Sequence, residues 1–406
     1  MKHHRIILIG ILVLALIPRV WMLTQISPSD FYASPWYRGE GGDAAEYSAI
    51  AVNLAGGGGF SLEGRATNIR PPLYPFFLAG IYRVFGNENL TAVRIAQIVM
   101  ALAMLALFWL LTHRLTASNA AAHLATLLLG LHPRFIIYNL VPLTETLFFS
   151  LMLVVCWYAL RWHASGKTPH LTLAFCVLAL AAFTRPTALY LAPVLALWAW
   201  YCNKKRGVPV FSLVLPGLLL FIALTGVWVA RNYGQFHSFT FSNKSGGGLA
   251  EAWDRTILEP LGISNRDILA PYMHLSEEEF AKIGYKVFLT EIYDHPLLIT
   301  KIILLKAVYW FNPFVKTSSG LFRMAHAALT SALFILGAYG LWHFWKMHGK
   351  EIPLLFLLLM GIFSAMHILT VPYHRYRFPV IEPYLMLFAS YAVVEMLNKL
   401  KNQKQK

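Results

Sequence analysis

The sequence has 406 residues, of which 57% are hydrophobic and only 13% are charged. A soluble globular protein carries about 25% charged residues, so this composition excludes an ordinary soluble domain and indicates a chain that folds in a lipid bilayer. The formal net charge of +15 would suit a nucleic-acid-binding protein. However, the basic residues lie in short segments between long apolar runs, which excludes nucleic acid as a partner and indicates membrane topology instead.

Ten apolar stretches are expected to be membrane-spanning helices, because backbone polar groups inside a bilayer must be satisfied within their own segment. They lie near residues 6–25, 92–112, 119–133, 140–160, 170–184, 186–201, 208–230, 323–345, 352–370 and 379–397. The first stretch starts with basic residues, as a signal peptide does, but no small-residue cleavage site follows it and Pro18-Arg19 interrupts it. We therefore expect a retained first helix. The sequence predicts an all-α integral membrane protein.

The distribution of charge predicts which loops lie on which side of the membrane. Basic residues gather in short segments such as Lys204-Lys205-Arg206, whereas the long polar segments 27–89 and 231–297 hold more acidic than basic residues. By the positive-inside rule, the short basic loops are cytoplasmic and the two long segments are external. We expect a multi-pass protein of the cell inner membrane whose active site faces the periplasm. Its parts would be a transmembrane catalytic module (1–230), an external subdomain (231–297) and a C-terminal part (298–406).

The region before the last membrane helices predicts two further helices. Ser276–Glu279 reads as an N-cap and acidic first turn of a helix that runs to about Tyr293. The stretch 297–314 is apolar enough to be an eleventh span, but a span there would place the later basic loops outside. Lys301 and Lys306 in its middle favour a helix that lies at the membrane surface. We therefore expect an interfacial helix.

Residues suited to catalysis concentrate in the first external segment. Asp43 and Glu46 begin an amphipathic helix that runs to about Ala55, and Arg70 begins the sequence Arg-Pro-Pro-Leu-Tyr-Pro. Glycines and prolines fix turns in this segment. The apolar run Pro72–Phe85 is too short to span and is expected to lie along the membrane interface. Between these two surface helices, Asp43 is a candidate base and Arg70 is a candidate phosphate-binding residue.

These motifs resemble a known family. An Asp soon after the first helix, a Gly-rich turn with Phe60-Ser61, and then Arg70-Pro-Pro-Leu-Tyr-Pro are similar to the bacterial branch of the protein mannosyltransferase and aminoarabinose transferase families. Both families are glycosyltransferases with the GT-C fold. The resemblance covers roughly the whole chain and is strongest over residues 40–200. The further matching motifs are Pro142–Phe148, Arg185-Pro186 and Arg375–Pro379.

The resemblance implies a GT-C helical bundle that uses a polyprenyl-phosphate-linked sugar delivered from the membrane. It assigns the catalytic base of the family to Asp43 and the residue that binds the lipid-linked phosphate to Arg70. A second acidic residue of the family corresponds to Glu145, as a supporting acid or metal ligand. The acceptor, whether a glycan, a lipid or a protein, does not carry over from the family.

The chemistry of sugar transfer from a phosphate supports the same residue types. The leaving phosphate is a stable anion, so the reaction needs cations where its charge grows rather than a strong general acid. It also needs a base that takes the proton of the acceptor hydroxyl, and we expect inversion at the anomeric carbon. Arginine side chains can fork onto phosphate oxygens. The candidate substrate-binding residues are Glu46, Arg70, Tyr74, His132, Arg134, Arg185, His374, Arg375 and Arg377.

Each of these assignments has a structural alternative. Asp43 is also well placed to be the N-cap of the helix that follows it. Glu145 could instead be a buried partner for an arginine at a helix end. Arg375 and Arg377 could pair with Glu382 rather than with a substrate.

The sequence does not demand a cofactor and leaves two other functions open. The histidines show no metal-ligand spacing, although a divalent cation held by Asp43 and Glu145 would fit the chemistry of some GT-C enzymes. A transporter or flippase for a lipid-linked glycan would need charged or broken helices at the bilayer midplane. Here the ionisable residues collect at helix ends and in external loops. A non-catalytic membrane protein that only binds a glycolipid is the second alternative.

Overall fold

The computed structural model describes residues 2–27, 31, 42–204, 209–242, 274, 286, 289–290, 292–314 and 320–404. Most of the second external segment, including most of the helix predicted from Ser276 to Tyr293, therefore lies outside the described residues. The described chain is almost entirely helical, with a short antiparallel hairpin in the first external segment.

The elements follow the hydrophobic stretches closely. In chain order they are α1 (Lys2–Gln25), α4 (Gly42–Ala55), β1 (Ser61–Leu62), β2 (Arg65–Ala66), α5 (Leu73–Phe85), α6 (Leu90–Thr116), α7 (Asn119–Gly130), α8 (Pro133–Tyr138), α9 (Glu145–Ser165), α10 (Thr168–Ala182), the 3₁₀ helix η1 (Pro186–Tyr190), α11 (Leu191–Asn203), α12 (Val210–Phe236), α17 (Pro296–Phe311), α18 (Gly320–His348), α19 (Glu351–Leu369), α20 (His374–Arg377) and α21 (Glu382–Lys404).

The described part of the chain contains six helices that are long and apolar enough to cross a bilayer, namely α1, α6, α9, α12, α18 and α19. The helices α7 and α10 are apolar but shorter. The chain is therefore a multi-pass membrane protein. The ten predicted stretches overlap α1, α6, α7, α9, α10, α11, α12, α18, α19 and α21. That all ten cross the bilayer remains a prediction.

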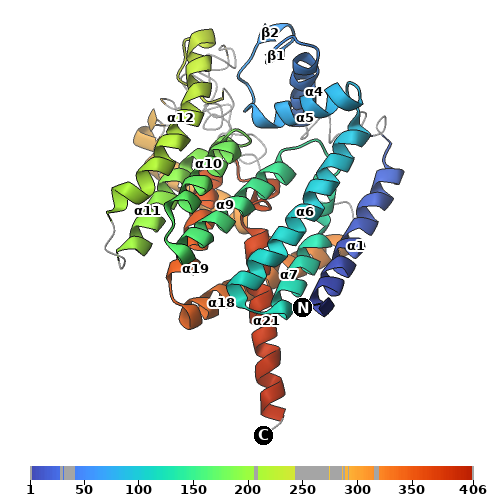
Figure 1. Cartoon of the computed structure of the whole chain (residues 1–406). Coiled ribbons are helices and arrows are strands. Elements are labelled where there is room, and N and C mark those ends of the chain that lie inside the picture. The colour runs from blue at the N-terminus through green and yellow to red at the C-terminus, as the bar shows by residue number, and fades with distance from the viewer. Residues whose placement is uncertain are drawn as a thin grey trace.

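The bundle has two distinct ends (Figure 1). The N-terminus and the C-terminus lie at one end, while α4, α5 and the hairpin lie at the other. At that second end α5 runs across the bundle rather than along it. One face of α5 is buried, including Tyr74 and Leu78, and the other exposes Phe76 and Val84. This amphipathic helix fits the surface helix expected at Pro72–Phe85.

Aromatic packing fixes the short helix α20 within this framework. Phe378, which directly follows α20, is 1% exposed. Its ring lies 5.7 Å from the rings of both Phe135 and Tyr138 on α8, and 6.3 Å from that of Phe149 on α9 (centroid distances). Aromatic contacts of this kind add to the free energy of area burial. The position of α20 is thus set by α8 and α9, far away in sequence.

A buried polar network lies below the turn that leads into α9. Pro18-Arg19, which interrupts the first apolar run, lies within α1, as expected for a single retained first helix. Arg19 is fully buried, and its Nε donates to the side-chain oxygen of Asn139 at 2.8 Å. The side chain of Gln97 donates to the carbonyl oxygens of Asn139 and Val141 at 3.1 and 2.9 Å. Because buried polar groups must be paired, this network holds the 139–144 turn in one conformation.

The stretch expected to lie at the membrane surface forms α17, and its two lysines have different surroundings. Lys301 is exposed, whereas Lys306 is only 2% exposed and its Nζ donates to the carbonyl oxygen of Thr370 at 2.8 Å. Whether α17 lies at the membrane surface remains a prediction, but the charge of Lys306 is used inside the protein. Its ammonium satisfies a carbonyl at the C-terminal end of α19, where a cation also interacts favourably with the helix dipole.

Candidate active site

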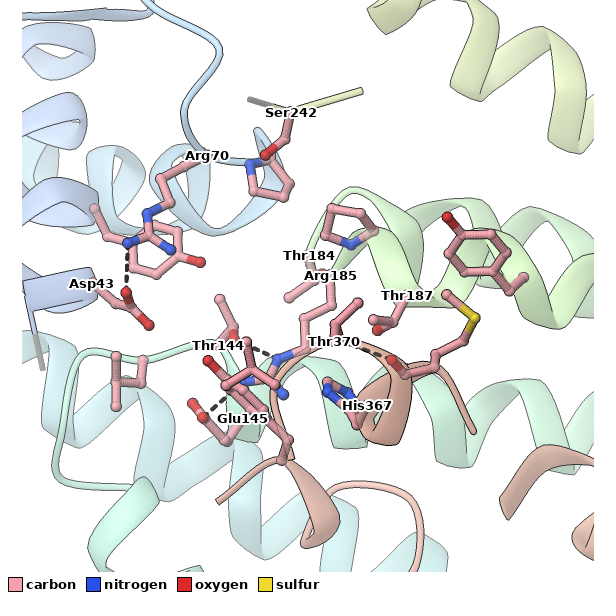
Figure 2. A pocket seen from close by; sticks show the side chains of 18 of the residues that line it. Asp43, Arg70, Thr144, Glu145, Thr184, Arg185, Thr187, Ser242, His367 and Thr370 are labelled. Atoms are coloured by element: carbon pink, nitrogen blue, oxygen red, sulfur yellow. Dashed lines mark hydrogen bonds and ion pairs between the residues drawn. The ribbon is translucent and has the colours of Figure 1, made fainter. Parts of the chain in front are cut away.

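A cavity of about 310 Å³ lies between the first external segment and the ends of several helices. Its wall contains Asp43 from α4, Arg70 from the loop before α5, Glu145 from the start of α9, Arg185 before η1, and Tyr376 from α20. Figure 2 shows Asp43 and Arg70 on one side of this cavity and Glu145 and Arg185 on another. The cavity therefore joins five segments of the chain, and we call it the Asp43 cavity.

Asp43 bridges two arginines from distant parts of the sequence. Its Oδ1 lies 2.5 Å from Nη2 of Arg70, and its Oδ2 lies 2.5 Å from Nη2 of Arg375. The side chain of Asp43 is 23% exposed, against 8% for Arg70 and 18% for Arg375. Asp43 lies in the first turn of α4, where a carboxylate is also stabilised by the helix dipole. The carboxylate thus has each oxygen bound by a cation.

Arg70 is held by more than Asp43. Its Nε donates to Glu46 at 2.6 Å, and its guanidinium lies 5.0 Å from the centre of the Tyr47 ring. Burial acts to lower the pKa of Arg70, but Tyr47 and the carboxylates of Asp43 and Glu46 raise the pKa above its ordinary value. Burial also raises the pKa of Tyr47 to about 12, against the opposing effect of Arg70. Arg70 is therefore a fixed, permanently charged group.

A second ion pair, between Glu145 and Arg185, lies on the side of the cavity away from Asp43 and Arg70. We call this side the inner wall. Oε1 of Glu145 accepts a hydrogen bond from Nη2 of Arg185 at 2.7 Å, and Nε of Arg185 donates to the hydroxyl of Thr144 at 2.9 Å. Glu145 is 1% exposed. The guanidinium of Arg185 lies 5.0 Å from the centre of the Tyr376 ring. Both predicted acids, Asp43 and Glu145, therefore line one cavity, and each is paired with arginine.

Several predicted substrate-binding residues lie in a separate cluster that does not line the Asp43 cavity. At its centre Glu382, 1% exposed, accepts from Nε of Arg377 at 2.7 Å and from Nη1 of Arg134 at 3.0 Å. Nε2 of His132 lies 3.8 Å from the other oxygen of Glu382. This arrangement is the structural alternative that pairs Arg377 with Glu382. We call it the Glu382 cluster.

The Glu382 cluster contacts α20 directly. Arg134 also donates to the carbonyl oxygen of His374 at 3.2 Å. The ring of His374 stacks on Tyr309, with centroids 4.6 Å apart, and a ring nitrogen lies 2.8 Å from the carbonyl oxygen of Tyr309. As a result, α20 presents Arg375 to Asp43 and Arg377 to Glu382.

Tyr74 also lies away from the cavity wall. It is fully buried, and its hydroxyl donates to the side-chain oxygen of Gln97 at 2.8 Å. The hydroxyl of Tyr74 therefore links α5 to the polar network below the 139–144 turn. The side chain does not line the Asp43 cavity.

Sequence reasoning missed several polar residues of the cavity wall. Thr187 and Ser242 line the cavity, as does His367 near the end of α19. The ring of His367 lies 4.8 Å from that of Tyr376, a residue inside the Arg375–Pro379 motif. The hydroxyl of Ser242 donates to the carbonyl oxygen of Ile69 at 3.1 Å, beside Arg70. Tyr376 and Thr144, which also lines the cavity, stood within motifs that could have identified them, whereas Thr187, Ser242 and His367 did not.

The described residues contain no group of three or more His, Cys, Asp or Glu side chains that could hold a metal ion. Asp43 and Glu145, the two candidate ligands for a divalent cation, make ion pairs with arginines in this structure. The use of a cation by this site remains a prediction.

Comparison with known proteins gives one match to a family model. Residues 69–229 match the model described as dolichyl-phosphate-mannose-protein mannosyltransferase. This segment begins beside Arg70 and ends within α12, so it contains Glu145 and Arg185. No curated protein matches the chain significantly. The family match confirms the resemblance to protein mannosyltransferases inferred from the sequence.

Solved structures give the fold. The Archaeoglobus fulgidus oligosaccharyltransferase in its apo form is similar, with a TM-score of 0.58 and 13% identity over 98% of this chain and 51% of that chain. This chain therefore spans about half the length of that protein. ArnT from Cupriavidus metallidurans also matches in its apo state, with a TM-score of 0.40 and 13% identity over 86% of this chain and 72% of that one. For ArnT bound to undecaprenyl phosphate the TM-score is 0.36, with 14% identity over 86% and 73%. The similarity to the oligosaccharyltransferase confirms the predicted GT-C fold.

Proposed function

We propose that this GT-C membrane protein, similar to protein mannosyltransferases, is a glycosyltransferase that moves a sugar from a polyprenyl-phosphate donor to an acceptor on the periplasmic side. The observation that carries the proposal is that Asp43, which lines the Asp43 cavity together with Arg70, is also paired with Arg375. A carboxylate beside two guanidinium groups supplies both requirements of the reaction, a base and cations for a leaving phosphate.

In the proposed step, the acceptor hydroxyl gives its proton to the carboxylate of Asp43 while its oxygen forms a bond to the anomeric carbon. The bond from that carbon to the phosphate oxygen breaks, and both of its electrons leave with the polyprenyl phosphate. Attack from the face opposite the phosphate inverts the anomeric carbon. The sugar develops positive charge in the transition state, which favours an anionic base nearby.

Arg70 and Arg375 are the cations proposed for the phosphate. Both now contact Asp43, and the phosphate of a donor offers oxygens that compete for the same N–H groups. Once the phosphate binds these guanidinium groups, Asp43 loses part of the pairing that holds it as an anion. Its affinity for a proton then rises, as a base requires. Donor binding would therefore prepare the base.

The other candidates divide into two roles in this proposal. Glu145 and Arg185 serve the reactants, because they line the same cavity as Asp43. Arg134, His132, His374 and Arg377 act on α20 instead and keep Arg375 aimed at Asp43. They are positioning residues.

The placement of the cavity supports a periplasmic site. The Asp43 cavity includes α4 and the loop before α5, at the end of the bundle opposite both termini (Figure 1). The basic loops that the positive-inside rule assigns to the cytoplasm include Lys204 and the lysine-rich C-terminal segment. The site and these loops would then lie on opposite sides of the inner membrane.

A single assay with the purified full chain in lipid nanodiscs and in vesicles tests this function. The donor is a polyprenyl phosphate that carries a radiolabelled sugar, and extracts of glycans, lipids and proteins serve as acceptors. A transferase moves the label from the lipid to a new product. A transporter moves intact labelled lipid across the vesicle membrane, and a binding protein retains it unchanged. Either of the last two outcomes, without a labelled product, contradicts the proposal.

A further inference from the structure

The inner wall of the Asp43 cavity carries polar atoms that no neighbouring group satisfies. Among the described residues, Oε2 of Glu145, Nη1 of Arg185, Oγ1 of Thr187 and Nε2 of His367 are buried and have no hydrogen-bond partner. All four residues line the cavity, and Figure 2 shows them near one another, apart from Arg70. Buried polar groups in proteins are almost always paired, so four such atoms on one wall call for a ligand.

The charges on this wall already cancel. Glu145 and Arg185 form an ion pair through Oε1 and Nη2, at 2.7 Å. The unsatisfied Oε2 and Nη1 are therefore the remaining hydrogen-bonding atoms of one neutral pair. Oε2 is an acceptor only and Nη1 is a donor only. A ligand for this wall must offer a donor and an acceptor close together.

The chemistry of the pair selects among sugars. An acidic sugar that satisfied Arg185 would bring its carboxylate close to the free oxygen of Glu145, and like charges that are both buried repel strongly. An amino sugar that satisfied Glu145 would bring an ammonium group close to Arg185. Two adjacent hydroxyl groups satisfy both residues, because one donates to Glu145 and the other accepts from Arg185. No further charge is then buried, which avoids the cost of desolvating an ion.

We propose that Glu145, Arg185, Thr187 and His367 form the subsite for the sugar ring of the donor, and that this sugar is uncharged with at least two adjacent free hydroxyl groups. This inference rests on the proposed function and deepens it, since it names the class of sugar. The phosphate would lie at Arg70 and Arg375, and the ring would extend from there to the inner wall. Thr187 and His367 would bind further ring hydroxyls.

Binding to the full chain in nanodiscs tests the subsite separately from transfer. The probes are the bare polyprenyl phosphate, polyprenyl phosphates that carry glucose, galactose or mannose, and the matched glucuronate, galacturonate and mannuronate lipids. We expect at least one neutral sugar to bind about tenfold more tightly than both its uronate and the bare lipid, equal to about 1.4 kcal/mol.

Two variants and one control identify the residues responsible. Thr187→Val removes a hydroxyl at nearly constant shape and should reduce the advantage of the neutral sugar over the bare lipid. Glu145→Gln removes the negative charge and should shrink the discrimination against the uronate at least tenfold, a change that a purely structural role would not produce. The control is Ser390→Ala on α21, because Ser390 is also fully buried with an unpartnered hydroxyl but does not line the cavity. It should bind every probe as the unmodified chain does.

The outcomes separate the two proposals. If the bare lipid binds but a neutral sugar adds no affinity, or if a uronate binds most tightly, the subsite proposal is wrong while the proposed function stands. The same holds if both variants bind all probes as the unmodified chain does. If no polyprenyl phosphate binds at all, with or without a sugar, the proposed function itself fails.

Discussion

Oδ2 of Asp43 lies 2.5 Å from Nη2 of Arg375, although 332 positions separate these residues in the sequence. The other oxygen of Asp43 makes an equally short contact with Arg70. One carboxylate therefore joins the first external segment to α20. Residues that contact Asp43 are expected to act in substrate binding or catalysis. Residues that contact only α20 are expected to position Arg375.

Arg375 and Arg377 offer a matched pair of variants, because they lie two positions apart and face different partners. Arg375→Gln should weaken binding of polyprenyl phosphate by about tenfold or more, since a hydrogen bond to a charged group contributes about 1.5–3 kcal/mol. It should lower the thermal stability less than Arg377→Gln does, because the pair is partly exposed and Arg70 remains to pair with Asp43. Lipid binding measured in nanodiscs checks the affinity, and thermal unfolding in detergent checks the stability.

Arg377→Gln should show the reverse pattern. Arg377 is fully buried against Glu382, and removing one partner of a buried ion pair typically destabilises a protein by about 3 kcal/mol. Arg134 remains to pair with Glu382, so the chain should still fold. If Arg377→Gln weakened lipid binding as much as Arg375→Gln while unfolding at the normal temperature, Arg377 would belong to the phosphate site instead.

Tyr74→Phe tests whether Tyr74 contacts a substrate. The change would leave the side-chain oxygen of Gln97 buried without the hydroxyl that now donates to it, which costs about 1–3 kcal/mol of stability. We expect a lower unfolding temperature and an unchanged KM for the donor. A raised KM at normal stability would show that Tyr74 reaches the sugar.

His132 gives the protein a predictable response to acid. Burial lowers the pKa of His132 to about 4, against about 6.5 in an unfolded chain. The unfolded state therefore binds a proton first as pH falls, and the folded state loses stability between about pH 6.5 and pH 4. Stability from this residue is fully present above pH 6.5.

Thermal unfolding of His132→Phe checks this response, since phenylalanine keeps the stacking against Phe378 but cannot take a proton. The unfolding temperature of the variant should fall less steeply than that of the unmodified chain as the pH drops from 7 to 4. The exposed His3→Phe should behave as the unmodified chain does. An equally steep loss in His132→Phe would rule out this histidine as the cause.

Much of this architecture could be read from the sequence, because hydrophobic length and loop charge are local signals. They located the helices, and the order of short motifs identified the GT-C fold. Asp43, Arg70 and Glu145 could be chosen because they stand at helix ends in those motifs. The sequence also placed Arg185 and Arg375 at the same external face as these residues. It could not show which acid each arginine contacts.

Other features depended on tertiary contacts that no local pattern contains. Arg375 and Arg377 belong to one motif, and the packing of Phe378 together with the contacts of the Glu382 cluster decides which of them faces Asp43. Nothing in the sequence around Lys306 indicates that its ammonium group donates to a carbonyl oxygen at the end of α19. Thr187 stood in an apolar stretch with no motif of its own to mark it.

The central claim is that Asp43 acts as the base beside Arg70 and Arg375. Single-turnover transfer from a radiolabelled polyprenyl-phosphate sugar tests it most directly, with Asp43→Asn compared with Glu63→Gln, an exposed acid on the same external segment. We predict that Asp43→Asn lowers the rate by about 10²–10⁴-fold, as expected for loss of a general base, while it still binds the donor lipid, and that Glu63→Gln transfers normally. A normal rate in Asp43→Asn would contradict the account.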